Sequence, residues 1–155
     1  MNAEMKKYIL EDLENFEVDG NGYKICPSGD YTGIREFPSR CIFGEQSSFG
    51  RLCSFGDRCI FGERCSFGER CRFGGQCKVE NNKEIKEMIK FEGFGSIHRC
   101  TYFFKLTDGR IYVRCGCFAG YIDKFREQVK ETHGDNKFAK EYEAVADLAE
   151  MHFGD

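Results

Sequence analysis

The stretch CIFGEQSSFGRLCSFGDRCIFGERCSFGERCRFGGQCKV, from Cys41 to Val79, decides the fold of this chain. It divides into consecutive six-residue units, each with a small first residue, phenylalanine in third place and glycine in fourth. Ser47 is the one departure from the leading cysteine, and Val79 is the one departure from phenylalanine. A strict short period predicts a β-solenoid, because one unit cannot bury its apolar side chain alone and must stack on its neighbours.

The unit also indicates which side chains point inward. Residues two apart share one face of a strand, so the cysteine and phenylalanine face the interior and the residue between them faces outward. We expect the glycine to relieve the backbone at a tight corner. A five-residue repeat is excluded, because it would require apolar residues at Ser48 and Arg58.

This array resembles the left-handed β-helix of hexapeptide-repeat proteins, in which three units form one triangular coil. The resemblance implies that each residue stacks on the residue three units later, and that phenylalanine rings replace the aliphatic core usual in that family. The inward columns that it implies are Cys41/Cys59/Cys77, Ser47/Cys65, Cys53/Cys71, Phe43/Phe61/Val79, Phe49/Phe67 and Phe55/Phe73.

The flanking segments differ in character from the repeat. We predict a mixed β/α protein in which residues 1–36 form an N-terminal helix and cap, 37–92 a short left-handed β-helix, and 93–155 a β-hairpin with two helices. Residues 80–90 keep a weak six-residue phase, so a degenerate last coil and a connecting helix both remain open. The expected helices and first strand are Ala3 to Phe16, Tyr121 to His133, Asn136 to about Met151, and Tyr23 to Cys26.

The hairpin has a predictable register. Two β-rich runs, Ile97 to Leu106 and Ile111 to Phe118, flank Asp108-Gly109, which is a strong two-residue turn signal. If these two residues are the turn, the numbers of paired residues sum to 217, and Cys100 faces Cys117. We expect the two C-terminal helices to cover the face that carries this pair.

That register brings three cysteines and a histidine together: Cys100, Cys115, Cys117 and His98. Three thiols and an imidazole are zinc ligands, but the usual two-residue spacing between cysteine ligands is missing. We therefore interpret these cysteines as reduced, packed thiols, with a zinc site and a Cys100–Cys117 disulfide as alternatives. No cofactor is expected.

Composition narrows the function classes. The net charge is −3, and segments 1–40, 41–79 and 80–155 carry −3, +2 and −2, which disfavours direct nucleic-acid binding. No apolar run approaches the roughly 18 residues of a membrane span, and no signal peptide is recognisable, so we expect a cytoplasmic protein. Ten cysteines would suggest disulfides in a secreted chain, but here most fill the inward repeat position.

Catalysis is not expected. Many hexapeptide β-helices are acyltransferases, and the resemblance implies that such an enzyme would carry a catalytic histidine on or beside its coils. His98, His133 and His152 all lie outside the repeat. The sequence shows no activated nucleophile, carboxylate pair or phosphate-binding glycine loop.

The outward repeat positions are the candidate contact surfaces. Ile42, Ile60 and Lys78 stack on one face, and Ile42 and Ile60 are the expected oligomer interface. The resemblance implies a trimer, with a dimer as the alternative. A basic surface that binds an anion or an acidic partner is the functional interpretation of four repeat arginines, and salt bridges across the coils are the alternative: Arg58, Arg64, Arg70 and Arg72.

The chain as a whole resembles uncharacterised proteins of bacteriophages and bacterial mobile elements. The matching motifs are Cys26-Pro-Ser-Gly-Asp-Tyr, the Cys-x-Phe-Gly array, Gly93-Phe-Gly-Ser, Thr101-Tyr-Phe-Phe, Ile111-Tyr-Val-Arg-Cys-Gly-Cys-Phe and Glu131-Thr-His-Gly. We therefore expect a phage-type interaction protein that binds a bacterial host or defence component and interferes with it. An oligomeric sponge for an anionic nucleotide and a structural assembly protein are the two alternatives.

Overall fold

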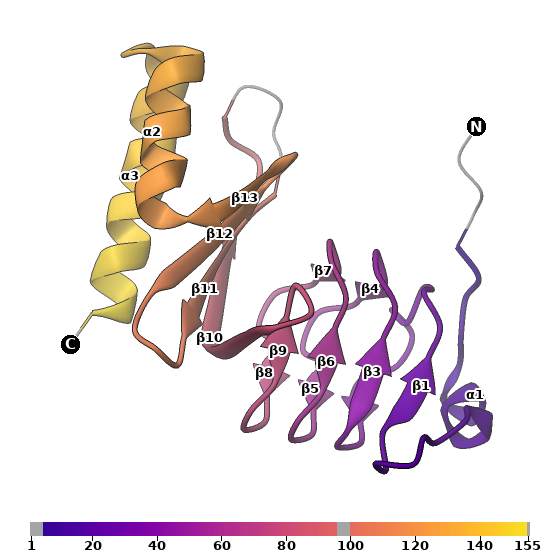
Figure 1. Ribbon diagram of the computed structural model, residues 1–155. Helices are drawn as coiled ribbons and strands as arrows, with labels where there is room; N and C mark the ends of the chain where they lie inside the picture. Colours follow the sequence, from indigo (N-terminus) through magenta and orange to yellow (C-terminus); the bar gives the residue numbers. More distant parts are fainter. Residues whose placement is uncertain (1–4, 96–99, 155) are drawn as a thin grey trace. The chain divides into compact units, whose positions relative to one another are not determined.

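The computed structural model describes residues 5–95 and 100–154. It shows a mixed β/α protein with two compact units, Met1–Lys86 and Glu87–Asp155. The first unit is a β-solenoid of about three turns, and the second is an antiparallel sheet with two helices (Figure 1).

The solenoid consists of short strands in three parallel columns. The strands are β1 (Lys24–Cys26), β2 (Glu36–Phe37), β3 (Cys41–Phe43), β4 (Ser48–Phe49), β5 (Ser54–Phe55), β6 (Ile60–Phe61), β7 (Ser66–Phe67), β8 (Arg72–Phe73) and β9 (Lys78–Val79). We name the columns by their outward residues: β1-β3-β6-β9 is the isoleucine face, β4-β7 the serine face and β2-β5-β8 the arginine face. Ile42 pairs with Ile60 and Ser48 with Ser66, so the expected offset of three units is confirmed.

Aromatic rings fill the interior in a regular pattern. Each ring stacks nearly parallel on the ring one coil away, as Phe43 does on Phe61 at 5.2 Å and 11°. Within one coil the rings meet edge to face, as Phe43 and Phe49 do at 4.8 Å and 82°. Both arrangements suit the quadrupole of an aromatic ring. The predicted inward face is confirmed, because Phe43, Phe49 and Phe61 are each at most 3% exposed.

The N-terminal segment caps this ring stack. Tyr8 lies on Tyr31 at 5.1 Å, and Tyr31 in turn lies on Phe49. Extended backbone holds Tyr8 there, because the Tyr8 N–H donates to the Asp30 carbonyl and the Asp30 N–H donates to the Lys6 carbonyl; α1 therefore spans only Leu10–Asn15. The predicted helix from Ala3 to Phe16 is therefore too long, because extended backbone pairing places the Tyr8 ring over the core. Parallel pairing already begins at β1, upstream of the expected start at residue 37.

Residues 80–90 form neither of the two structures considered from the sequence. Glu80 and Asn81 have φ values of 48° and 68°, which reverse the chain directly after β9. Strand β10 (Lys83–Phe91) then runs antiparallel to β9, with Lys83 opposite Val79. Ile85 lies six residues after Val79 and is only 3% exposed, so a buried apolar side chain still falls at the repeat interval.

In the second unit, the strand order is β10-β11-β12-β13. The new elements are β11 (Thr101–Leu106), β12 (Ile111–Cys115), β13 (Phe118–Tyr121), α2 (Ile122–His133) and α3 (Lys137–Phe153). The two predicted helices are confirmed, and Asn136 caps α3 by accepting from the Ala139 N–H at 3.0 Å. The helices pack on one sheet face through a core that includes Phe103, Val113, Phe125 and Ala146.

The predicted hairpin register is wrong by one residue. Phe103 pairs with Val113 and Thr101 with Cys115, so paired numbers sum to 216. The loop has three residues rather than two, because Leu106 and Arg110 still pair and Gly109, at φ 93°, completes the turn. The predicted second strand is also divided, since Gly116, at φ 58°, begins a turn between β12 and β13.

Candidate binding surface of the solenoid

The corners of the solenoid display long side chains on left-handed backbone. Every residue that precedes the first position of a repeat unit has φ near 60°. Left-handed backbone costs a residue with a Cβ about 1–2 kcal/mol, and glycine would avoid that cost. None of these seven residues is glycine: Arg40, Gln46, Leu52, Arg58, Arg64, Arg70 and Gln76. The same conformation recurs at every corner whatever the residue type, so it belongs to the turn of the coil, and coil stacking offsets its cost.

The array glycines have a different role from the expected one. Their φ values are not positive, and the corner turns two residues later. A Cβ on Gly62 would lie 2.7 Å from the backbone nitrogen of Glu45 in the neighbouring coil, and one on Gly68 would lie 2.3 Å from that of Arg51. Glycine is therefore required because successive coils approach closely, not because the backbone turns there.

The four candidate arginines do not form one surface. Arg58 stands between β5 and β6, at the corner of the arginine and isoleucine faces, and Arg64 stands at the next corner, between β6 and β7. Arg70 lies between β7 and β8, and Arg72 is the first residue of β8. Arg70 and Arg72 are thus neighbours, and the other two are on separate corners.

Arg70 and Arg72 share their corner with a third arginine. Arg51 lies between β4 and β5, one coil away, where its backbone contacts the position of Gly68. We call Arg51, Glu69, Arg70 and Arg72 the arginine corner. All four residues are exposed, and three positive charges face one negative charge.

The salt bridges considered across the coils are not formed. Within residues 5–95 and 100–154, no ion pair includes Arg51, Arg58, Arg64, Arg70 or Arg72. The guanidinium groups of the arginine corner therefore keep their hydrogen-bonding capacity for a partner. Arginine presents a planar fork of donors that matches a carboxylate.

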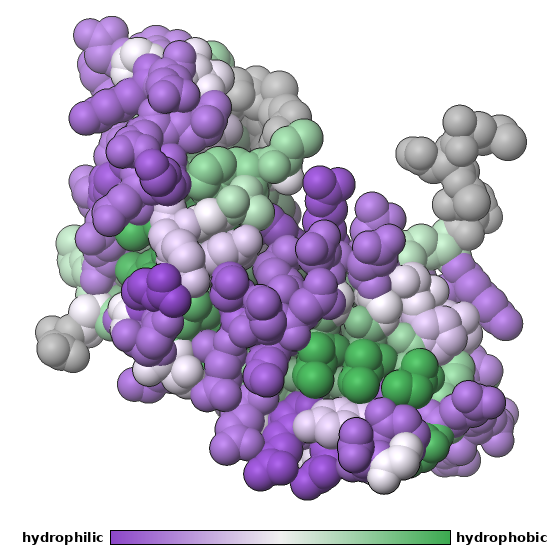
Figure 2. Space-filling model, in the orientation of Figure 1, coloured by the Kyte–Doolittle hydropathy of each residue, from purple (hydrophilic) through white to green (hydrophobic). Residues whose placement is uncertain are grey.

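The isoleucine face is the apolar side of the solenoid. Ile25 pairs with Ile42 and Ile42 with Ile60, which forms the row visible over β1, β3 and β6 in Figure 2. Ile25 is 42% exposed, and Ile42 and Ile60 are half-buried. A cavity of about 120 Å³ adjoins the row, and its lining residues are Tyr23, Arg58, Ile60, Gln76, Lys78 and Glu84.

The interior thiols are hydrogen-bonded and protected. Cys59 donates to the Pro38 carbonyl at 3.3 Å, and Cys77 donates to the Gly56 carbonyl at 3.3 Å. A hydrogen bond with Cys26 raises the pKa of Cys41 to about 12, and one with Cys41 raises that of Cys59 to about 12. Such thiols remain protonated, and a protonated thiol is a poor nucleophile and metal ligand.

The hairpin cysteines do not converge as the predicted register required. Cys115 pairs with Thr101, so Cys100 projects from the opposite face of the sheet. Cys117 is exposed in the turn after β12. His98 lies outside the described residues. In the part of the chain that the structure describes, no cysteine forms a disulfide, and no group of His, Cys, Asp and Glu could hold a metal ion.

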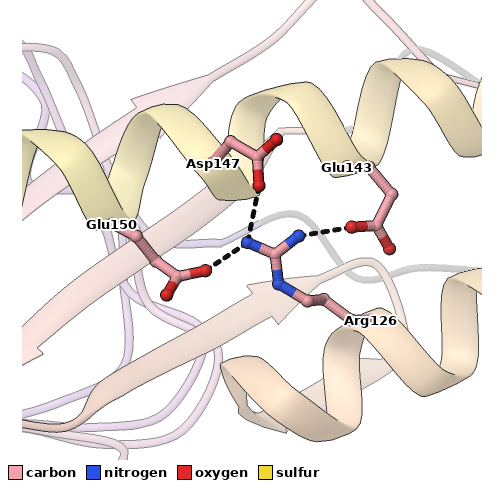
Figure 3. A network of polar contacts seen from close by, with 4 residues as sticks. All are labelled: Arg126, Glu143, Asp147 and Glu150. Atoms are coloured by element: carbon pink, nitrogen blue, oxygen red, sulfur yellow. Dashed lines mark hydrogen bonds and ion pairs between the residues drawn. The ribbon is translucent and has the colours of Figure 1, made fainter.

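The sequence did not indicate the polar network that joins the two helices (Figure 3). Arg126 on α2 binds three carboxylates on α3, with 2.9 Å between its Nη2 and Asp147 Oδ1, and with contacts to Glu143 and Glu150. The only available signal was the spacing of these acids on one side of α3. The network is structural, because it joins neighbouring helices within one unit.

The two described histidines lie apart from the repeat. His133 stacks on Tyr142 at 5.6 Å, and His152 lies 2.9 Å from Glu87.

Comparisons with protein-family models, curated proteins and solved structures find no match. Among the described residues, none of the helices has the length and apolar character needed to cross a membrane.

Proposed function

We propose that this chain is a non-catalytic, phage-type binding protein that acts in the cytoplasm of a bacterium. Its scaffold is a short left-handed hexapeptide β-helix, and its target is an acidic surface of a host or defence component. The phage context follows from the resemblance of the sequence motifs, and interference with the target is the expected consequence of binding.

The arginine corner is the observation that carries this proposal. Arg51, Arg70 and Arg72 are exposed, and none of them forms an ion pair with a described residue. The stacked rings behind them make the backbone rigid, so binding orders the arginine side chains but not the backbone that carries them. A positive edge on a chain with a net charge of −3 favours an acidic protein over nucleic acid.

Affinity capture from a bacterial lysate tests the proposal. The wild-type chain is compared with the double variant Arg70→Glu/Arg72→Glu, and captured proteins are identified by mass spectrometry. We expect one acidic partner whose binding weakens at least about tenfold in the variant, since each reversed charge costs about 1 kcal/mol or more. Higher salt should weaken the wild-type complex as well.

Charge reversal on the second unit is the matched control. Lys124→Glu/Lys140→Glu changes the net charge equally at exposed positions of α2 and α3, and it should leave capture unchanged. If the wild type and Arg70→Glu/Arg72→Glu captured the same partner equally well, the arginine corner would not be the binding surface. The absence of any captured partner from permissive host lysates would refute the binding role.

A further inference from the structure

The isoleucine face has one basic and one acidic edge. Arg40 and Arg58 stand just before β3 and β6, and Glu45 and Glu63 stand two residues after these strands. Because the strands are parallel and in register, their starts align along one edge of the face and their ends along the other. Asp57 also stands beside Arg58 and Arg64 beside Glu63, so the row of isoleucines runs between an edge with excess positive charge and an edge with excess negative charge.

Arg58 and Glu63 are available for a contact, whereas Arg40 already donates to the Asn21 carbonyl at 3.3 Å and lies over the Tyr23 ring. In the described ranges 5–95 and 100–154, neither Arg58 nor Glu63 belongs to an ion pair. Arg58 lines the 120 Å³ cavity together with Lys78, Glu84 and Ile60, so the basic edge contains a recess beside the apolar row. Because Glu84 lies opposite Lys78 in the strand pairing, Arg58 is the cation left for an incoming group, and a carboxylate suits it in charge and size.

Symmetry determines which occupant matches both edges. Two isoleucine faces can meet about a two-fold axis parallel to the solenoid axis, which places the basic edge of each copy on the acidic edge of the other. A two-fold axis along the strands would instead place arginine on arginine. Only the first arrangement is self-complementary, and it also places the apolar rows on each other.

We propose that a second copy of this chain docks on the isoleucine face, forming a two-fold dimer with parallel solenoids. Arg58 of each copy faces Glu63 of the other at the same height, and Arg40 faces Glu45. Ile42 and Ile60 pack on the same residues of the second copy. The dimer goes beyond the proposed function and does not depend on it.

The size of the face sets the strength of the contact. Four strands about 4.8 Å apart and six residues of about 3.3 Å each give roughly 400 Å² per copy. A stable dimer buries about 800 Å² per partner, so this dimer is reversible and forms at high protein concentration. In a three-sided coil the arginine corner lies opposite the isoleucine face, which leaves it exposed in both copies.

Sedimentation velocity over a series from micromolar to near-millimolar protein tests the dimer. The wild type should pass from monomer to dimer, and Arg58→Glu or Glu63→Arg alone should weaken association at least tenfold. The combined variant Arg58→Glu/Glu63→Arg should dimerise again. An equimolar mixture of the two single variants should form a heterodimer, because both of its charge contacts are then complementary.

Controls separate this contact from folding and from partner binding. Glu69→Arg and Arg70→Glu reverse charges at the arginine corner and should leave the dimer unchanged, and circular dichroism should show every variant folded. Ile42→Glu/Ile60→Glu should be monomeric. A wild-type chain that stays monomeric, a trimeric mass, or a charge-swapped variant that does not regain association would each overturn the proposal. If the wild-type chain dimerised but captured no partner from the lysate, the proposed function would be contradicted and the dimer would stand.

Discussion

Replacing Phe61 by alanine should be among the most damaging single changes in the solenoid. Phe61 is completely buried, and its ring contacts five other phenylalanine rings. The closest is Phe55, whose ring centroid is 4.8 Å away. Phe73, near the end of the array, is only half-buried and contacts three rings, which makes it the matched control.

The expected magnitude follows from these contacts. Phe-to-Ala changes in well-packed cores cost about 3–5 kcal/mol, because transfer free energy is lost and a cavity remains. Phe61→Ala should reach this range, since Phe43 in one neighbouring coil, Val79 in the other and the rings beside it hold the cavity open. Phe73→Ala should cost about 1–2 kcal/mol, because part of its ring is already exposed to solvent.

Urea unfolding followed by circular dichroism measures both variants. With an m-value of about 2 kcal/mol/M, Phe61→Ala should lower the midpoint by roughly 2 M, and Phe73→Ala by less than half as much. If the two variants lost equal free energy of unfolding, the assignment of Phe61 to the centre of a continuous ring stack would be refuted.

Three further predictions concern close packing, thiols and the helix pair. Gly62→Ala should cost about 1–3 kcal/mol in urea unfolding, whereas Gly75→Ala, with its nearest atom 3.7 Å from the new Cβ, should cost less than about 0.5 kcal/mol. Cys41 and Cys59 keep their protons up to a pKa of about 12, whereas unfolded thiols ionise near 9.0, so unfolding free energy should fall as pH rises from about 9 to 12. A flat profile over that range would contradict the buried thiol column. Arg126→Met should lower unfolding free energy by about 1–2 kcal/mol at low salt and by less at high salt, because its network is partly exposed.

The hairpin illustrates where local signals failed. Asp108-Gly109 correctly placed a turn, but a two-residue and a three-residue loop share that signal. Packing of the core selects the three-residue loop, because pairing Phe103 with Val113 places both side chains under the helices. The shift of one residue in strand register places Cys100 on the opposite sheet face from Cys115, so the expected cluster of cysteines does not form.

The sequence by itself determined the stacked interior of the solenoid. A six-residue spacing of phenylalanine admits one alternating inward pattern, and burial of the rings selects it regardless of the flanking segments. The positions of the two C-terminal helices were also readable, because helical spacing of apolar residues is local.

Only the tertiary structure decided which outward side chains act together. Four arginines of one repeat array are distributed over three corners, and Arg51 joins Arg70 through the neighbouring coil rather than through sequence proximity. The opposite charges at the two edges of the isoleucine face likewise appear only when strand starts and ends are aligned. Such neighbourhoods depend on how coils stack and turn, and that geometry is set by contacts between residues far apart in the chain.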